Sequence, residues 1–144
     1  MTITSLHPRR AARECTLKAV FAYNFSNNEG SIIIAQLIEK NPEIKKNKDF
    51  IVLLFNYVIK HMLWTDKLIK AHLENWEIDR VAQIDKILLK MGICEIYFID
   101  DIPPKVTISE MVEISKIYST DESPVFINGI LDAVYKDYQK QKKV

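Results

Sequence analysis

The residue types that usually do chemistry in enzymes are scattered along this sequence rather than grouped. The three histidines, His7, His61 and His72, are not at the spacings of three or four residues that place two ligands on one metal ion. The sequence has no glycine-rich loop for a phosphate and no nucleophile elbow around a serine. We therefore expect no metal, no cofactor and no catalytic residue. The classes excluded most firmly are nucleotide hydrolysis, cofactor-dependent redox chemistry and metal-dependent hydrolysis.

The strongest local feature is a group of arginines at the start of a predicted helix. Arg9 and Arg13 are four residues apart and so share a helix face, with Arg10 beside them. Cations in a first helical turn oppose the helix dipole, which suggests that these charges are placed for a partner. Guanidinium groups suit phosphate because they form paired hydrogen bonds, so the cluster is a candidate contact for an RNA backbone. From the spacing alone, an ordinary solvated charged face is an equally good interpretation.

A few other residues invite a functional interpretation beside a structural one. Phe126 lies in the first turn of the last predicted helix, next to an acidic loop. Core packing is its default role, but it could also be a stacking platform for an unpaired base. Glu95 falls in line with the apolar positions of its helix, which favours a buried, hydrogen-bonded carboxylate over a general acid. Cys15 and Cys94 match no metal spacing, so we expect reduced cysteines in the core.

The elements that position these residues are predicted to be helices. A chain of 144 residues has the size of one domain, and its 48% of apolar residues can fill a core. Three glycines and five prolines are too few for the many turns of a sandwich or barrel. The net charge is +1, but both ends are basic and the stretch between Glu95 and Glu122 is acidic. No apolar run or signal segment suits a membrane, so we expect a cytoplasmic protein without membrane contact.

Apolar periodicity and helix breakers divide the chain into about seven helices. The first predicted helix runs from about Pro8 to Phe25, and the second runs from Ser31 to Glu39 and is ended by Asn41–Pro42. An apolar stripe from Phe50 to Met62 predicts the third helix, Thr65 is the predicted cap of the fourth, and the fifth is predicted to start at Asp79 and to stop by Pro103–Pro104. The sixth is predicted to run from a cap at Ser109 to Tyr118, and the last to start at Ser123–Pro124. Within the last helix we interpret Gly129 as the site of a close helix crossing.

Three stretches, taken together, identify a family. They cover residues 9–15 (Arg-Arg-Ala-Ala-Arg-Glu-Cys), 104–114 (Pro-Lys-Val-Thr-Ile-Ser-Glu-Met-Val-Glu-Ile) and 126–132 (Phe-Ile-Asn-Gly-Ile-Leu-Asp). In this order and spacing they resemble the NusB family of bacterial transcription antitermination factors. Trp76, Arg80 and the segment 84–95 fill the interval in the order expected of that family. The resemblance covers nearly the whole chain, although Ala11 stands where a typical member has a third consecutive arginine.

The resemblance implies an all-α fold with about seven helices in two packed bundles. It implies a single domain over 1–144, with an N-terminal bundle of about 8–76 and a C-terminal bundle of about 78–140. It also implies joint binding of boxA-type single-stranded RNA from ribosomal RNA leaders with NusE, a small-subunit ribosomal protein. The pair then acts within the RNA polymerase antitermination complex and supports processive transcription of ribosomal RNA.

The resemblance also assigns residues to these contacts. The RNA backbone is expected at Arg9, Arg10 and Arg13. The RNA path near the last helix is expected at Glu122, Ser123 and Phe126. The protein partner is expected at Phe21 and Asp85.

Two other functions stay open beside a non-catalytic antitermination factor. The same helical domain resembles the RNA-binding front of some ribosomal RNA cytosine methyltransferases. Those enzymes need a long Rossmann-type domain with a glycine-rich cofactor loop, and we expect none because no such loop occurs in this sequence. The other alternative is a NusB-like RNA-binding or homodimerisation module without an antitermination role.

Overall fold

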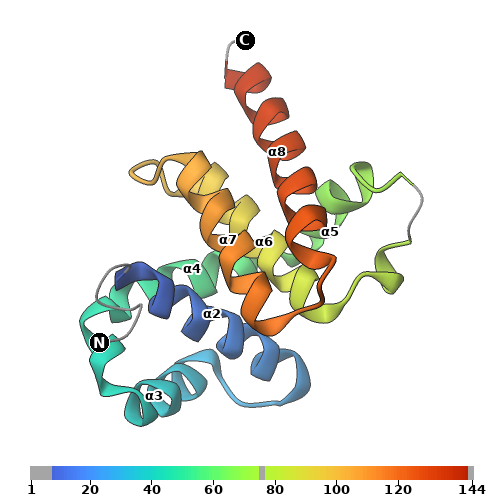
Figure 1. Cartoon of the computed structure of the whole chain (residues 1–144). Coiled ribbons are helices and arrows are strands. Elements are labelled where there is room, and N and C mark those ends of the chain that lie inside the picture. Colours follow the sequence, from blue (N-terminus) through green and yellow to red (C-terminus); the bar gives the residue numbers. More distant parts are fainter. Residues whose placement is uncertain (1–7, 75–76, 143–144) are drawn as a thin grey trace. The chain divides into compact units, whose positions relative to one another are not determined.

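The computed structural model describes residues 8–74 and 77–142, and the regular structure of these residues is entirely helical (Figure 1). It comprises α2 (Pro8–Phe25), α3 (Gly30–Lys40), the 3-10 helix η1 (Pro42–Asn47), α4 (Lys48–Lys60), α5 (Met62–Ala71), the 3-10 helix η2 (Ile78–Arg80), α6 (Gln83–Phe98), α7 (Pro104–Tyr118) and α8 (Ser123–Lys142). The predicted all-α class with about seven helices is confirmed. Among the described helices, none combines the length and the apolar character that crossing a membrane requires.

The chain divides into two compact units, which we call unit 1 (Met1–Lys60) and unit 2 (His61–Val144). The predicted bundles, 8–76 and 78–140, differ from these units in the assignment of α5. This helix packs against α6 within unit 2. The Lys90 ammonium of α6 also reaches α5, with Nζ 2.6 Å from Asp66 Oδ1 and donating to the Met62 carbonyl at 3.3 Å.

Unit 1 is built on the pairing of α2 with α4, and α3 and η1 pack beside them. Apolar residues recur along α4 at helical spacing, and Ile51, Leu54 and Val58 are fully buried. Leu17 and Val20 supply buried apolar side chains from α2. Burying each such side chain contributes roughly 1.5–3 kcal/mol, so this pairing holds α2 and its arginines in place.

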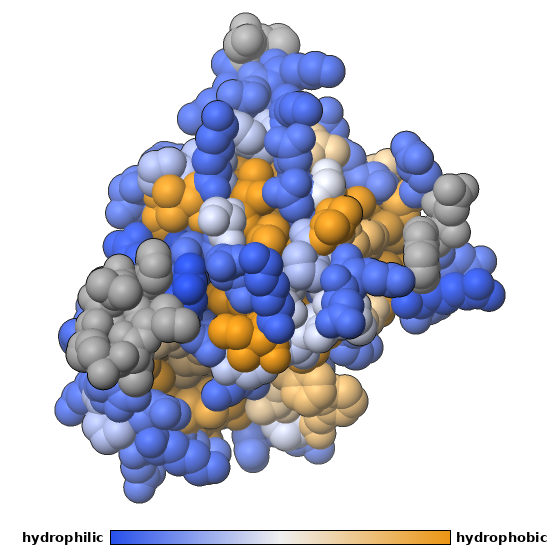
Figure 2. Space-filling view, viewed as in Figure 1, coloured by the Kyte–Doolittle hydropathy of each residue, from blue (hydrophilic) through white to orange (hydrophobic). Residues whose placement is uncertain are grey.

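Unit 2 is organised around α6, which packs against α5, α7 and α8. Every residue from Ile87 to Ile96 is buried, polar ones included. Glu95 is fully buried and accepts a hydrogen bond from the Thr107 hydroxyl at 2.8 Å, as expected for a satisfied core carboxylate. The lysine-rich end of α8 stands at the top of Figures 1 and 2 and is covered by hydrophilic side chains.

The predicted close helix crossing at Gly129 is wrong. A Cβ built on Gly129 meets no heavy atom within 4 Å, whereas a Cβ on Gly92 would lie 2.7 Å from Cδ1 of Leu131. Gly92 of α6 is therefore the glycine at which α8 comes close. The apolar neighbours Ile127 and Ile130 are buried on the inner side of α8, and Gly129 lies on its exposed side.

Two predicted helix caps are also wrong. α5 begins at Met62, so Thr65 lies inside it, and the Thr65 hydroxyl donates to the carbonyls of His61 (3.0 Å) and Met62 (3.1 Å). α7 begins at Pro104, five residues before Ser109, because a proline in the first turn needs no backbone donor. Hydroxyl residues give the same sequence signal at a helix start and within a helix, where they bond to the preceding turn.

Candidate nucleic-acid interface

The predicted arginine cluster lies on α2 in unit 1 and borders Phe50 of α4. The guanidinium carbon is 4.7 Å from the centroid of the Phe50 ring for Arg9 and 5.4 Å for Arg13. Both distances are within the range of cation–π interactions, about 6 Å. The three arginines differ in exposure, since Arg9 is exposed, Arg10 is half-buried and Arg13 is only 2% exposed.

This difference divides the cluster into two kinds of residue. The side chains of Arg9 and Arg10 are accessible to a phosphate at the surface of unit 1. Arg13 is packed inside, where its guanidinium lies against an aromatic ring that is itself buried. The sequence spacing predicts that Arg9 and Arg13 share one helix face, and both do contact Phe50, but only Arg9 is exposed to solvent.

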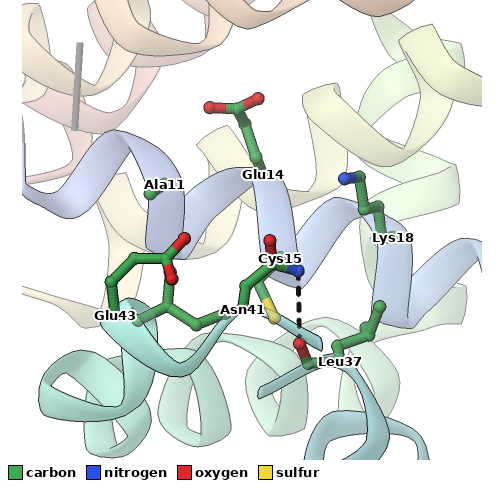
Figure 3. A pocket seen from close by; sticks show the side chains of 8 residues that line it. Ala11, Glu14, Cys15, Lys18, Leu37, Asn41 and Glu43 are labelled. Atoms are coloured by element: carbon green, nitrogen blue, oxygen red, sulfur yellow. Dashed lines mark hydrogen bonds between the residues drawn. The ribbon is translucent and has the colours of Figure 1, made fainter. Parts of the chain in front are cut away.

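A second feature of α2 is an open-sided cavity of about 180 Å³ (Figure 3). Cys15 points from α2 towards the segment that carries Leu37 and Asn41, where the Asn41 amide donates to the Leu37 carbonyl at 3.3 Å. Burial raises the pKa of the Cys15 thiol to about 11. The thiol is thus protonated at neutral pH, and a protonated thiol is a poor nucleophile and a poor metal ligand. The predicted core positions of Cys15 and Cys94 are confirmed, as both are buried.

The histidines also have structural contacts rather than a shared site. His72 lies with Nδ1 2.9 Å from the Leu68 carbonyl and Nε2 2.8 Å from Asp137 Oδ2. The His61 ring stacks on Phe98 at 4.5 Å between centroids. Among the described residues, no three or more histidines, cysteines or acids are grouped to hold a metal ion. His7 and Trp76, which the sequence also singled out, lie outside the described residues.

In unit 2, predicted site residues gather where α6 and α8 both begin. Asp85, in the first turn of α6, accepts a hydrogen bond at Oδ1 from the Ser119 hydroxyl (2.6 Å). Its Oδ2 accepts another from the Ser123 hydroxyl (2.8 Å). Asp85 is 6% exposed and Ser123 only 1%, and a buried carboxylate requires such donors. The structure therefore joins the residue predicted to meet a protein partner directly to one predicted to meet RNA.

The Ser123 hydroxyl is held from two sides. A serine has one hydroxyl proton, and here it is donated to the Asp85 carboxylate. The oxygen in turn accepts the backbone N–H of Thr120 at 3.2 Å, while the Ser123 N–H donates to the Thr120 carbonyl at 3.1 Å. These reciprocal bonds close a turn immediately before α8, which begins at Ser123 as predicted. The turn, and Glu122 within it, is thereby tied to α6.

A pocket of about 210 Å³ opens beside this network. Its lining consists of Arg80, Val81, Ala82, Asp85, Thr120, Glu122, Ser123 and Phe126. All three residues predicted to line the RNA path near the last helix therefore border one pocket. Phe126 is half-buried and Glu122 is exposed, so the pocket offers an aromatic side chain and a carboxylate together.

The two residues predicted to meet the protein partner lie in different units. Phe21 of α2 is 38% exposed, and its ring lies 4.9 Å from the ring of Phe25, which is 69% exposed. Adjacent exposed aromatic side chains are typical of a protein contact surface. Asp85, by contrast, is buried, with both carboxylate oxygens engaged within unit 2. The sequence pattern places Phe25 with Phe21 on one apolar side of the first helix and assigns Phe25 no binding role, although its i+4 spacing from Phe21 was a usable signal.

The sequence also gave no role to Ser119, Thr120 and Arg80, which complete the network and its pocket. A usable signal existed for the first two, because hydroxyl residues just before a predicted helix commonly bond to its first turn. The carboxylate that accepts from Ser119 belongs to Asp85, which lies 34 residues earlier in the chain. No local pattern points to that contact.

A family model described as the NusB family matches residues 10–136. The chain belongs to the NusB family. A relative named transcription antitermination protein NusB, from Chloroherpeton thalassium, is 40% identical over 134 residues, which are 92% of this chain and 64% of that protein. Another of the same name, from a Nitratiruptor species, is 36% identical over 129 residues, covering 90% of this chain and 92% of that protein.

Solved structures show the same NusB fold. A structure of NusB from T. maritima superposes with a TM-score of 0.81 at 33% identity, and the match covers 90% of this chain and 91% of that one. A crystal structure of antitermination factors NusB and NusE with double-stranded RNA matches with a TM-score of 0.80 at 23% identity, over 90% and 97% of the two chains. At that identity the second match supports the NusB fold alone.

Proposed function

We propose that this chain is a transcription antitermination factor that binds boxA-type single-stranded RNA together with NusE. In this role it joins the RNA polymerase antitermination complex and supports processive transcription of ribosomal RNA. The observation that carries the proposal is the family match over residues 10–136, together with relatives named transcription antitermination protein NusB. The proposed place of action is the cytoplasm, and the proposed role is binding without catalysis.

The arginines of unit 1 support a phosphate contact. Arg9 is exposed and Arg10 is half-buried, and a guanidinium matches the paired oxygens of a phosphate. Arg13 is assigned to the same contact but acts from a buried position, where it packs on Phe50 beside Arg9. Its contribution to RNA binding is to hold the start of α2 and its neighbours in place.

The pocket of unit 2 supports a contact with unpaired bases. Phe126 offers an aromatic side chain, and Glu122 and Ser123 border the same pocket. Single-stranded RNA is commonly read by aromatic side chains on which bases stack and by polar groups at their edges. The exposed pair Phe21 and Phe25 supports the contact with NusE, and Asp85 contributes through the network that it anchors.

The test is RNA binding measured by fluorescence anisotropy with a labelled boxA-type RNA and a scrambled RNA, with and without NusE, over a salt series. We expect tighter binding of the boxA-type RNA when NusE is present. Arg9→Ala combined with Arg10→Ala should weaken that binding at least about tenfold. Each lost phosphate contact to a single strand lowers the salt slope by about 0.7, so the double variant should lower it by about 1.4.

A matched control is Lys45→Ala combined with Lys46→Ala, which removes two exposed charges of the same sign from unit 1. This control should bind RNA like the unaltered chain, and both variants should keep the helical circular-dichroism signal. Equal binding by the arginine variant and the lysine control would contradict the RNA role of the cluster. A tight homodimer that ignores both NusE and RNA would favour a self-association module instead.

A further inference from the structure

The pocket beside Asp85 contains a cation that the proposed RNA residues do not include. Arg80 ends η2, is exposed, and lines the pocket together with Glu122 and Phe126. Within the described part of the chain, Arg80 forms no ion pair that would account for its position. The pocket therefore combines an aromatic side chain, a guanidinium donor and a carboxylate acceptor.

The walls of the pocket suit a flat, largely apolar occupant. Val81, Ala82 and Phe126 supply the apolar part of the lining, and the volume of about 210 Å³ accommodates a single ring system rather than a helix. Pockets with mostly apolar walls and a few placed polar groups are typical of sites for small planar ligands. A base of single-stranded RNA has this form, since both of its faces are apolar and its edges are polar.

The pocket is also held in shape by the surrounding network. Thr120 and Ser123 form reciprocal hydrogen bonds across the turn, and Ser123 is anchored to the buried Asp85 carboxylate. Ser119 holds the other oxygen of that carboxylate. A site whose wall is fixed by such contacts loses little conformational freedom when it binds a ligand.

The two charges identify which base fits. A guanidinium donates to the O6 and N7 acceptors of guanine, which is the commonest arginine–base contact. A carboxylate accepts hydrogen bonds from N–H groups, and guanine carries these at N1 and N2 on its other edge. Of the four RNA bases, guanine alone presents two adjacent acceptors to an arginine on one edge and two adjacent N–H donors to a glutamate on another. We infer that this pocket binds one unpaired guanine, stacked on Phe126, with Arg80 and Glu122 as the residues that determine specificity.

This inference rests on the proposed RNA-binding function, and its test separates the two. RNA binding is measured with NusE and with boxA-type RNAs in which each guanine in turn is replaced by 7-deazaguanine, which lacks the N7 acceptor. Arg80→Ala should weaken binding of the unmodified RNA about tenfold. For the RNA modified at one particular guanine, the same variant should cause almost no further loss. The salt slope should stay unchanged, because a base contact releases no counterion.

Lys70→Ala is the matched control, since Lys70 is another exposed cation of unit 2. It should affect no RNA in the series. Glu122→Gln keeps the shape of the side chain and should weaken binding of the unmodified RNA but not of an RNA with an abasic site at the same position. An Arg80→Ala variant that weakens all RNAs equally and lowers the salt slope by about 0.7 would overturn the inference, because Arg80 would then contact a phosphate.

A separate titration of the protein with guanosine monophosphate distinguishes RNA from a free nucleotide. Tight binding of this nucleotide without RNA, lost in Arg80→Ala, would overturn the assignment to an RNA base. Weak or absent nucleotide binding, together with the guanine-dependent effect of Arg80→Ala, supports it. If the unaltered chain with NusE binds boxA-type and scrambled RNAs equally weakly, the proposed function fails first and the inference fails with it.

Discussion

The Asp85 carboxylate is hydrogen-bonded by two hydroxyls from much later in the chain. Ser119 follows it by 34 residues and Ser123 by 38, and the two hydroxyls occupy different oxygens. Because Asp85 and Ser123 are almost inaccessible to solvent, water cannot replace either partner without rearrangement. One side chain thus fixes both the start of α8 and the wall of the pocket.

We predict that Asp85→Ala lowers the free energy of unfolding by about 3 kcal/mol. The variant removes a charged acceptor from two hydrogen bonds, each worth about 1.5–3 kcal/mol when one partner is ionised, and part of this loss is recovered by relaxation. Urea unfolding followed by circular dichroism measures the change. Asp100→Ala is the control, because Asp100 is exposed and its loss should alter stability by less than about 0.5 kcal/mol. Equal stability of the two variants would contradict the role given to Asp85.

Residue types could be predicted from the sequence better than residue environments. Arg9 and Arg13 have the same type and share a helix face, yet one is exposed and the other buried. Phe50, which lies on another helix, packs against both guanidinium groups, and their exposures still differ. Such a contact depends on the packing of α2 with α4, which a local sequence pattern does not encode.

At the scale of helices, apolar periodicity predicted correctly where helices lie, whereas two hydroxyl residues did not predict correctly where helices begin. The spans of α2 and the start of α8 agree with the prediction, because long apolar stripes and proline signals define them. The predicted caps at Thr65 and Ser109 were wrong because both residues lie inside a helix, where the Thr65 hydroxyl donates to the carbonyls of the preceding turn. Helix existence is therefore more secure than helix boundaries.

The two glycines of α6 and α8 give a prediction at this scale. Gly129→Ala should raise the free energy of unfolding by about 0.5–1 kcal/mol, because alanine favours the helix and a Cβ there meets no neighbour. Gly92→Ala should lower it by about 1–2 kcal/mol despite the same helix preference. Its Cβ would lie 2.7 and 2.9 Å from the two methyl carbons of Leu131, a fully buried side chain that has little room to move.

Thermal or urea unfolding of both variants measures this contrast. Combining Gly92→Ala with Leu131→Ala supplies the check, because the shorter side chain removes the clash. In the Leu131→Ala background, Gly92→Ala should then cost less than it does alone. A Gly92→Ala variant as stable as Gly129→Ala would contradict this prediction, because α6 and α8 would then have room for a Cβ at Gly92.

At the scale of the whole molecule, each unit contains one buried cysteine. Burial raises the pKa of Cys15 in unit 1 from 9.0 to about 11, and that of Cys94 in unit 2 to about 12. In the unfolded chain both thiols release their proton near the ordinary value of 9.0. The folded state therefore binds more protons above pH 9, and stability falls there as the pH rises.

We predict that the stabilising contribution of both thiols is complete below pH 9 and is lost between pH 9 and about 12. Above pH 9 each thiol should lower the free energy of unfolding by about 1.4 kcal/mol per pH unit, up to about pH 11 for Cys15 and about pH 12 for Cys94. Urea unfolding at a series of pH values, compared with the double variant Cys15→Ala and Cys94→Ala, isolates the thiols from tyrosines and lysines. Parallel pH profiles of the two proteins would contradict the prediction.

The packing of the helices against one another was the feature of the fold that could be predicted least from the sequence. The Asp85–Ser119 contact and the packing of α8 against Gly92 both depend on residues more than 30 positions apart. The family resemblance predicts the RNA residues near the last helix, whereas the pocket that they share with Arg80 forms only when the helices pack together. Local patterns give helices, whereas the site arises from their packing.

The turn before α8 has a consequence for amide hydrogen exchange. The Thr120 N–H belongs to an exposed residue outside any helix, a position at which backbone amides normally exchange within seconds. Here it donates to a hydroxyl that is itself anchored to a buried carboxylate. Its deuterium uptake should therefore follow the slow opening of the α6–α8 contact rather than the motion of a loop. The exchange rate of that single amide would measure how often the hydrogen bonds beside the pocket of unit 2 open.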